Sequence, residues 1–279
     1  MHSGFVTLVG RPNVGKSTLV NAMCGHKVSI VSDKPQTTRH RVMGVLNTPG
    51  SQLVFVDTPG LHKPVTALGE RVNATALDSM SDVDVVCLVI DCTKPFGTGD
   101  KWVASHIDMS KAVVILNKID AAKQHQVLAQ LTALSALGAS DYFPVSAKSG
   151  AGIPELVAFL SAKLPEGPQY FPDDTFSDQP EEQWVAELVR EQLLAVTHDE
   201  LPYSIATRVT EWEWPRIRVE IIVERDSQKG MVIGKGGAVL KEVGKLARAQ
   251  LPEGCFLELF VKVDKDWQRK PERVQRLGY

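Results

Sequence analysis

The sequence has few of the features that mark secreted, membrane-spanning or nucleic-acid-coating proteins. Its four cysteines, Cys24, Cys87, Cys92 and Cys255, form no C-x-x-C pair, so we expect reduced core thiols rather than a disulfide framework or a zinc site. No apolar run approaches the length that spans a bilayer, and Met1 leads almost directly into an expected strand, so the sequence predicts neither a transmembrane helix nor a signal peptide. We therefore expect a cytoplasmic protein.

The overall charge and composition are ordinary. The formal net charge is −2, which argues against a global basic field for nucleic acid but leaves a local basic patch open. A hydrophobic content of 43% and a charged content of 23% are typical of globular proteins. With 279 residues and no internal repeat, the chain is long enough for about two domains.

One short segment near the N-terminus carries the strongest motif. Residues 10–18 fit G-x-x-x-x-G-K-[ST], the P-loop, between an apolar strand expected at 5–9 and a helix expected at 18–24. Glycines let main-chain N–H groups approach phosphate oxygens, and Lys16 adds a positive charge on the β and γ phosphates. The Ser17 hydroxyl suits Mg²⁺, which prefers oxygen ligands. A chance Lys-Ser after a glycine-rich turn is the alternative, which the flanking strand and helix disfavour. The predicted phosphate-binding residues are Gly10, Arg11, Pro12, Asn13, Val14, Gly15, Lys16 and Ser17.

Apolar strands and helices alternate through the first half of the chain. The strand expected at 83–91 is apolar almost throughout, as is typical of a parallel strand that is covered on both faces. This alternation predicts a doubly wound, mostly parallel α/β sheet, whose ligands bind at the carboxyl ends of the strands. The other expected strands lie at 41–46, 53–57, 112–116 and 142–145, and the expected helices at 68–80, 98–108, 122–137 and 153–164.

A second motif, Asp57-Thr-Pro-Gly60, ends one of these strands. A carboxylate in this place commonly holds the magnesium ion of a P-loop protein, and Gly60 can bring its N–H near the γ phosphate. D-x-x-G alone is a common turn, but it is informative about forty residues after a P-loop. We therefore add Asp57, Thr58, Pro59 and Gly60 to the nucleotide site, with Asp57 as a metal residue beside Ser17.

The third motif, Asn117-Lys-Ile-Asp120, discriminates between nucleotides. The Asp120 carboxylate can accept hydrogen bonds from guanine N1–H and the 2-amino group, which adenine lacks. A site built around such a bidentate contact rejects the wrong base by about 10⁴–10⁵-fold. The Asn117 amide can contact the other side of the base, the Lys118 stem can lie over its face, and the Ala147 N–H can reach O6. The predicted guanine-binding residues are Asn117, Lys118, Asp120, Ser146, Ala147 and Lys148.

Together, these motifs stand in the order of the five G motifs of a translation-factor-type GTPase. The segment 36–40 resembles switch I of the TrmE–Era–EngA group. By this resemblance Thr38 ligates Mg²⁺ in the GTP state, with Thr37 as the nearby alternative. The resemblance assigns the switch to Gln36, Thr37, Thr38, Arg39 and His40.

Two positions bear on hydrolysis. Leu61 follows the D-x-x-G motif where Ras-like proteins have the glutamine that orients water, so we expect slow intrinsic hydrolysis or help from another group. Asn13 stands where relatives in this group bind K⁺, which predicts potassium-stimulated hydrolysis. A loop-stabilising amide is the alternative interpretation of Asn13.

The chain changes character after a proline-rich linker. Residues 164–174 hold three prolines and a glycine, which is typical of a semi-rigid connection. An amphipathic helix is expected at 181–196, and alternating strands at 203–212 and 216–224. The expected domains are residues 1–164, a linker at 165–179, and residues 180–279.

A glycine loop marks the second domain. Val232-Ile-Gly-Lys-Gly-Gly237 is a G-x-x-G loop followed by a helix expected at 239–251, a strand at 255–263 and a closing helix at 266–277. In the order helix, strand, strand, loop, helix, strand, it resembles a type II KH domain, a smaller α+β fold whose loop clamps a nucleic-acid backbone. The alternative is a solvated helix face, which explains the lysines but not the glycines. The predicted RNA-binding residues are Ile233, Gly234, Lys235, Gly236, Gly237, Lys241 and Lys245.

A GTPase of this group followed by a KH domain resembles the bacterial Era family over nearly the whole chain. The resemblance implies a GTP-hydrolysing switch that binds the 3′ end of small-subunit ribosomal RNA during ribosome assembly, with Mg²⁺ and K⁺ as cofactors, no DNA partner and peripheral contact with the inner face of the cell membrane.

Two alternative functions remain open. A GTPase subunit of an RNA-modifying system requires further catalytic residues in the C-terminal half, where His198 is the only histidine. A binding module with a degenerate nucleotide site is disfavoured by intact Lys16, Ser17, Asp57 and Asp120.

Overall fold

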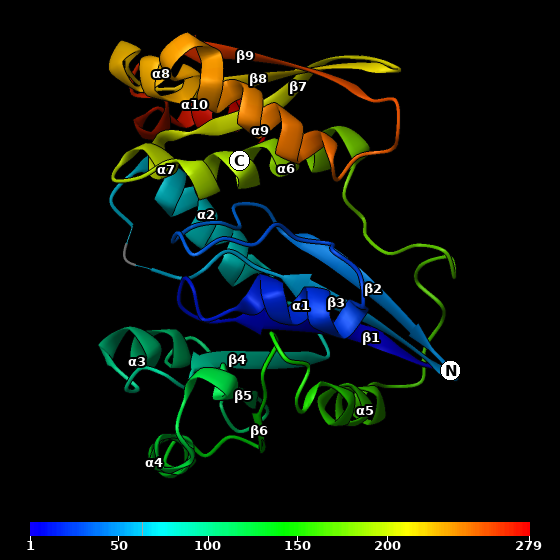
Figure 1. Cartoon of the computed structure of the whole chain (residues 1–279). Helices are drawn as coiled ribbons and strands as arrows, with labels where there is room; N and C mark the ends of the chain where they lie inside the picture. The colour runs from blue at the N-terminus through cyan, green and yellow to red at the C-terminus, as the bar shows by residue number, and fades with distance from the viewer. Residues whose placement is uncertain (63) are drawn as a thin grey trace. The chain divides into compact units, whose positions relative to one another are not determined.

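The computed structural model describes residues 1–62 and 64–279, which divide into two compact units (Figure 1). The first unit comprises Met1–Val31, Thr38–Pro64 and Val72–Asp178. The second comprises Ser32–Thr37, Val65–Arg71 and Gln179–Tyr279. Two short segments from the N-terminal half of the chain therefore group with the C-terminal residues.

The first unit is built on a six-stranded sheet in the order β2-β3-β1-β4-β5-β6. The β2 strand runs antiparallel to β3, and all the other neighbours are parallel, so the predicted mostly parallel sheet is confirmed. Its strands are β1 (His2–Val9), β2 (Val42–Thr48), β3 (Ser51–Asp57), β4 (Val85–Asp91), β5 (Val113–Asn117) and β6 (Asp141–Pro144).

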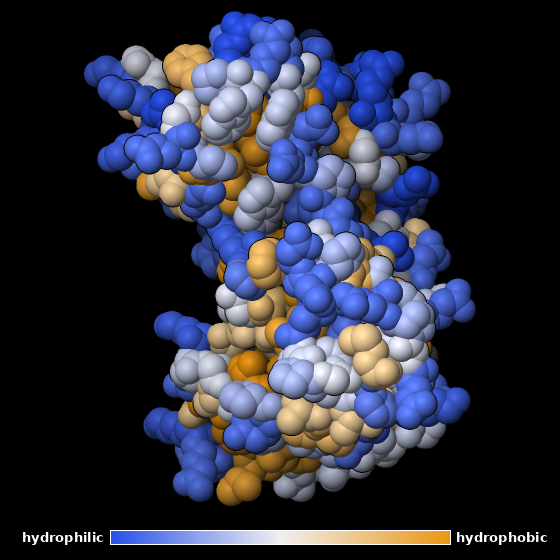
Figure 2. Space-filling view, turned by 90° about the vertical axis from the view of Figure 1, so that its right-hand side faces the viewer, coloured by the Kyte–Doolittle hydropathy of each residue, from blue (hydrophilic) through white to orange (hydrophobic). Residues whose placement is uncertain are grey.

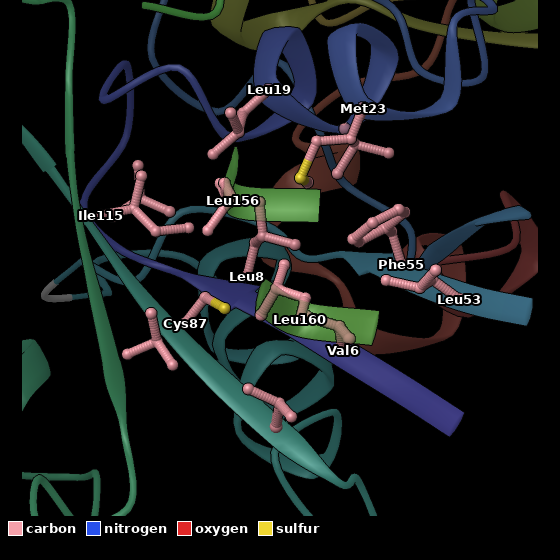
Figure 3. Close-up of a cluster of buried hydrophobic side chains, with 14 of the residues drawn as sticks. Val6, Leu8, Leu19, Met23, Leu53, Phe55, Cys87, Ile115, Leu156 and Leu160 are labelled. Carbon is pink, nitrogen blue, oxygen red and sulfur yellow. The ribbon is translucent and has the colours of Figure 1, made fainter. Parts of the chain in front are cut away.

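Helices cover both faces of this sheet. Helices α1 (Lys16–Cys24) and α5 (Ile153–Lys163) share one apolar cluster with the strands, and Figure 3 shows its side chains, including Leu8, Leu19 and Leu156, gathered between the elements. The second cluster, on the other face, joins α2 (Ala67–Asp78), α3 (Thr98–Ala104) and α4 (Gln124–Ser135) to β4 and β5. This double cover explains why β4 and β5 are almost wholly buried and apolar.

The predicted linker is ordered along the first unit. Gln52 on β3 accepts the Tyr170 N–H at 2.8 Å and donates to the Phe171 carbonyl at 2.8 Å. Farther along, the Val45 N–H donates to the Phe176 carbonyl at 3.0 Å, beside an isolated bridge between Gly44 and Ser177. We call residues 165–178 the strap, because they lie against β2 and β3 and belong to the first unit.

The second unit contains a three-stranded sheet in the order β7-β8-β9, with β7 and β8 antiparallel and β8 and β9 parallel. As predicted, one face of β8 is buried against the helices through Ile217, Val219, Ile221 and Val223. The elements are α6 (Glu181–Val196), α7 (Leu201–Ser204), β7 (Ala206–Glu213), β8 (Arg216–Val223), α8 (Asp226–Ile233), α9 (Ala238–Arg248), β9 (Phe256–Val263) and α10 (Pro271–Arg276).

Two local predictions in this unit were wrong, and one helix was not predicted. The strand expected at 203–212 begins only at Ala206, because residues 201–204 form α7. Before the glycine loop, the chain forms the unpredicted helix α8, whose start is capped by the Gln228 side chain, which accepts the Arg225 N–H. The closing helix expected at 266–277 is interrupted before Pro271, since proline starts a new helical turn rather than continuing one.

Hydrophilic side chains cover much of the face seen in Figure 2, with smaller apolar patches among them. Across residues 1–62 and 64–279, none of the helices combines the length and the apolar composition that crossing a bilayer requires.

Candidate functional site

The P-loop lies between the end of β1 and the start of α1, and tertiary contacts hold its backbone in place. Gly15 has φ of +95°, and a Cβ there would lie 2.5 Å from the Asn117 amide nitrogen, so only glycine fits. The Lys16 ammonium donates to the Gly10 and Arg11 carbonyls, each at 3.1 Å. Burial lowers the pKa of Lys16 to about 8, against the opposing attraction of Asp57. The P-loop is thus curled around its own lysine.

Arg11 anchors the P-loop from the side, through a residue that no sequence motif marks. Its Nε donates at 2.7 Å to Asp100 on α3, whose side chain is only 1% exposed. The second Asp100 oxygen accepts the Gly97 N–H at 3.0 Å. A Cβ at Gly99 would lie 2.6 Å from Arg11 Cδ, so the arginine stem packs closely on the first turn of α3.

Three predicted metal residues converge beside the P-loop. The Ser17 and Thr38 hydroxyls lie 2.8 Å apart, and Thr38 Oγ1 lies 3.5 Å from Asp57 Oδ2. Asp57 is fully buried, and its Oδ1 has no hydrogen-bond partner among the described residues. The Thr37 hydroxyl, the alternative, instead donates to the Lys34 carbonyl at 2.7 Å. This cluster of hard oxygens, with one buried carboxylate oxygen unused, fits Mg²⁺.

Burial raises the pKa of Asp57, and the Lys16 ammonium together with hydroxyl donors opposes that shift. A divalent cation favours the ionised carboxylate in the same way, because it places a positive charge against it. The charge of Asp57 therefore depends on the cations around it.

The D-x-x-G segment packs tightly on the P-loop. The Thr58 hydroxyl donates to the Leu8 carbonyl at 2.6 Å, and the Leu61 N–H donates to the Gly10 carbonyl at 3.2 Å. A Cβ at Gly60 would lie 2.7 Å from Pro12 Cα, so glycine is needed for this approach. The Leu61 side chain is 1% exposed and belongs to the core cluster with α2 and α3. It is packed as a core residue.

Asn117 connects the P-loop to the loop after β6. Its amide donates to the Val14 carbonyl at 3.0 Å and accepts the Ala147 N–H at 3.1 Å. The side chain expected to contact the base is thus also a structural tether, and the Ala147 N–H expected to reach O6 is bonded to it. The motif alone does not indicate this double role.

The remaining guanine-motif residues stand at the same edge of the sheet. The exposed Asp120 accepts the Ser146 hydroxyl at 2.6 Å.

Lys118 donates to the Asn13 carbonyl at 2.6 Å and to Asp91 at 2.7 Å. Although burial opposes it, hydrogen bonding by Lys118 and Thr93 lowers the pKa of Asp91. Asp91 therefore stays charged and fixes the Lys118 ammonium, a role that the sequence did not reveal. Lys148 is exposed, next to Ala147.

The predicted switch segment is divided between the two units. Gln36, with φ of 61°, and Thr37 group with the second unit, whereas Thr38, Arg39 and His40 group with the first. Within the second unit, the fully buried Arg190 donates to the Thr37 carbonyl. Arg190 is also paired with Glu187 at 2.6 Å.

The predicted RNA-binding loop joins α8 to α9. Gly234, Gly236 and Gly237 have φ of 72°, 61° and 80°, a backbone that glycine adopts readily. A Cβ at Gly234 would lie 2.6 Å from Val239, whereas Cβ atoms at the other two would meet nothing within 4 Å. The outer side of the loop is therefore open. Ile233 packs on the core of the unit, and Lys235, Lys241 and Lys245 are exposed on the loop and on α9.

Comparisons with known proteins agree with this geometry. A family model described as a 50S ribosome-binding GTPase matches residues 5–118, and one described as a KH domain matches residues 200–268. GTPase Era of Mycobacterium tuberculosis is 46% identical over 297 aligned residues, which cover all of this chain and 99% of that protein. GTPase Era of Heliobacterium modesticaldum is 44% identical and is covered to 97%. This chain belongs to the Era family of GTPases.

Solved structures of Era extend the match to three dimensions. A variant of Aquifex aeolicus Era bound to GDP and AlF₄⁻ superposes with a TM-score of 0.94 at 39% identity, covering all of this chain and 99% of that one. Era in complex with MgGDPNP and nucleotides 1506–1542 of 16S ribosomal RNA gives a TM-score of 0.95, also at 39% identity and with the same coverage. The Era family membership thus holds across both units, and the chain is a GTPase with a KH domain.

The comparison with known proteins disfavours both alternative functions. An Era GTPase is not a binding module with a degenerate nucleotide site. A GTPase subunit of an RNA-modifying system is disfavoured, because the relatives that match this chain over its whole length are GTPase Era proteins.

Proposed function

We propose that this Era-family protein is a GTP-dependent switch that binds the 3′ end of small-subunit ribosomal RNA during assembly of the small ribosomal subunit. The observation that carries the proposal is the match, over the whole chain, to Era in complex with MgGDPNP and nucleotides 1506–1542 of 16S ribosomal RNA. The open glycine loop with its exposed Lys235, Lys241 and Lys245 supports the same partner, because phosphate contacts supply most of the affinity for RNA.

In the proposed mechanism, the P-loop amides and Lys16 bind the β and γ phosphates, and Ser17, Thr38 and Asp57 hold Mg²⁺. The ion neutralises charge that develops on the phosphates during transfer. Asp120 recognises the guanine edge, and Asn117 keeps the P-loop and the loop at Ala147 in register around the base. These residues bind and orient the nucleotide.

The attacking water needs a group other than Leu61. The leucine has no hydrogen-bonding side-chain atom, and its side chain is packed in the core cluster with α2 and α3. We therefore expect slow hydrolysis by the isolated protein, because another group has to orient the attacking water, as a glutamine does in Ras-like proteins.

Potassium is part of the proposal. Asn13 has a left-handed backbone with φ of 64°, and its carbonyl accepts a hydrogen bond from Lys118 at 2.6 Å, so the backbone that carries its amide side chain is held in one conformation beside the P-loop. Turnover should be faster in potassium buffer than in sodium buffer. Equal rates would leave Asn13 as a loop-stabilising residue.

The domain limits and the location also remain proposals. We propose residues 1–164 as the GTP-binding domain, 165–179 as the linker and 180–279 as the KH domain, supported by the family matches at 5–118 and 200–268. We propose a cytoplasmic protein that associates peripherally with the inner face of the cell membrane, on family resemblance. Fractionation of cells before and after a high-salt wash tests the membrane part.

The central experiment measures RNA affinity and GTP turnover side by side. The probe is an RNA with the sequence of 16S nucleotides 1506–1542, titrated into protein loaded with GDPNP or GDP. Lys235→Glu should weaken RNA binding and reduce its salt dependence, by about 0.7 in the log–log slope for each phosphate that is no longer neutralised, without changing GTP hydrolysis. Lys16→Ala should abolish nucleotide binding and leave the second unit folded.

A switch requires the two ligands to affect each other. RNA affinity should differ between the GDPNP and GDP states by some factor, and RNA should change the ratio of the GDPNP and GDP affinities by that same factor. Identical RNA affinities would remove the switch but leave a GTPase that binds RNA. No measurable binding of this RNA in either state would overturn the proposed function.

A further inference from the structure

One buried residue of the second unit contacts the predicted switch segment. Arg190 on α6 is fully buried, and its Nη2 donates to the Thr37 carbonyl. Both residues belong to the second unit, because Ser32–Thr37 groups with Gln179–Tyr279. Thr38, the next residue along the chain, groups with the first unit and carries one of the predicted metal-binding hydroxyls. The chain therefore passes from one unit to the other at the peptide bond between Thr37 and Thr38.

The guanidinium of Arg190 is held in place by an acid on the same helix. Glu187, three residues earlier on α6, accepts the Arg190 Nε at 2.8 Å and Nη2 at 2.6 Å. Both residues are buried, so this bidentate pair is shielded from water. Although burial opposes it, the Glu187 carboxylate raises the pKa of Arg190, so the guanidinium stays charged. The donor to the Thr37 carbonyl is therefore fixed and cationic.

The segment that ends at Thr37 is also closed on itself. The Ser32 hydroxyl accepts the Lys34 N–H at 3.1 Å, and the Thr37 hydroxyl donates to the Lys34 carbonyl at 2.7 Å. Gln36 has a left-handed backbone with φ of 61°, which is uncommon for residues other than glycine. The Thr37 carbonyl that Arg190 holds thus stands at the end of a turn with its own hydrogen bonds.

The geometry of the peptide bond carries this restraint to Thr38. The Thr37 carbonyl and the Thr38 N–H belong to one planar group, which ends at the Thr38 Cα. A donor that fixes the carbonyl therefore restrains the position from which the Thr38 side chain starts. The hydroxyl of that side chain lies 2.8 Å from the Ser17 hydroxyl and 3.5 Å from Asp57 Oδ2, in the cluster that fits Mg²⁺.

We propose that Arg190 is a positioning residue for the predicted magnesium ligand Thr38. By holding the Thr37 carbonyl, it keeps the Thr38 hydroxyl where Ser17 and Asp57 can bind the same ion. A helix of the unit that carries the glycine loop thereby contributes to the affinity for Mg²⁺ and GTP. The inference rests on the proposed function, because it takes Thr38 as a ligand that Mg²⁺ engages in the GTP state and releases after hydrolysis.

The test removes the donor without leaving an unpaired charge in the core. The pair variant, Glu187→Leu with Arg190→Met, does so, since replacing a buried ion pair by apolar side chains of similar volume is often neutral for stability. The matched control, Glu220→Leu with Arg208→Met, removes another Arg–Glu pair of the second unit, whose nitrogens lie 2.7 and 2.6 Å from the carboxylate. Both control residues lie on the sheet, in β7 and β8.

The readout is the affinity for GDPNP and for GDP at one fixed Mg²⁺ concentration. Without Arg190, the nucleotide and its ion have to order the backbone at Thr38, so the pair variant should bind GDPNP about 5- to 30-fold more weakly. Its GDP affinity should stay within about twofold of the parent, since the GDP state releases Thr38. A merely structural role would weaken both nucleotides alike. The control should bind both like the parent.

Two further measurements connect the effect to Thr38. In a double-mutant cycle with Thr38→Ala, the GDPNP loss caused by the pair variant should disappear, because the side chain that Arg190 positions is already gone. In the nucleotide-free protein, a peptide spanning residues 34–41 should exchange its amide hydrogens faster in the pair variant than in the parent or the control. This second measurement tests the restraint without metal.

The outcomes distinguish this inference from the proposed function. If the pair variant and the control bind GDPNP equally well, or the pair variant loses GDPNP and GDP affinity alike, the positioning role is wrong and the proposed function stands. If Thr38→Ala leaves GDPNP affinity unchanged, Thr38 is not the ligand, and the inference fails without affecting RNA binding. If the parent does not bind RNA with the sequence of 16S nucleotides 1506–1542, the proposed function fails, while the nucleotide titrations still decide the role of Arg190.

Discussion

Replacing Asn117 by alanine should weaken GDP binding by about 30-fold. The side chain is 1% exposed and holds two loops at once, through the Val14 carbonyl at 3.0 Å and the Ala147 N–H at 3.1 Å. Alanine removes both hydrogen bonds, and burial leaves little room for water to replace them. The P-loop and the loop after β6 then lose the tether that keeps them in register.

The size of the effect follows from these two bonds. A buried polar group left without its partner costs about 1–3 kcal/mol, so two such groups cost about 2–6 kcal/mol. Part of this free energy is lost as stability of the first unit, and part as affinity, because a bound nucleotide must reorder the loops. If about 2 kcal/mol appears in binding, the dissociation constant rises about 30-fold.

A fluorescent GDP analogue measures the affinity, and Asn21→Ala is the matched control. Asn21 accepts the Val28 and Ser29 N–H groups at 2.9 and 3.0 Å and donates to the Ser29 carbonyl, so it makes the same kind of loop contacts without touching the P-loop. The control should lose stability and keep its affinity within about threefold. Equal affinity losses in the two variants, or a change below about threefold in Asn117→Ala, would refute the tether.

Three further outcomes are expected. Glu187→Ala should lower the free energy of unfolding of the second unit by about 3–5 kcal/mol, measured by hydrogen exchange in α6, because it leaves the buried guanidinium of Arg190 without the carboxylate that neutralises it; a loss below about 1 kcal/mol would contradict this. Gly15→Ala should abolish GDP binding, since its Cβ would lie 2.5 Å from the Asn117 amide, whereas Gly25→Ala, with no atom within 4 Å, should keep it. Burial raises the pKa of Cys87 to about 12, so thiol reagents should label it only after unfolding, even at about pH 9, and rapid labelling of the folded protein would disprove its burial.

The nucleotide motifs could be located from the sequence because each is tied to the end of a strand. Ser17 and Asp57 follow β1 and end β3, two neighbours in the sheet, and parallel neighbours end at the same edge. The same rule brings Asn117, the last residue of β5, close to Ser146, which follows β6. Spacing along the chain was therefore enough to predict which residues meet.

The partners of these residues could not be predicted in this way. Asp100 and Asp91 carry no motif, and their roles come from contacts with Arg11 and Lys118, 89 and 27 residues away in the chain. Local pattern contains no signal for such pairs. Only the folded arrangement shows that both acids position functional cations.

Helix α8 was missed for a different reason. It contains Gly230 and ends in Val232 and Ile233, residues with low intrinsic helix propensity. Its stability comes from packing, since Val232 is fully buried in the core of the second unit. Intrinsic propensity therefore favours a loop where the fold makes a helix.

The strap also has a consequence for how the first unit behaves in isolation. β2 is an edge strand, and the strap occupies its outer hydrogen-bonding groups at Met43, Gly44 and Val45. A shortened protein that stops before the strap would expose the backbone N–H and C=O groups of this edge. Two copies could then pair strand to strand, so we expect the shortened protein to self-associate. One that retains the strap keeps this edge shielded and should stay monomeric at the same concentration.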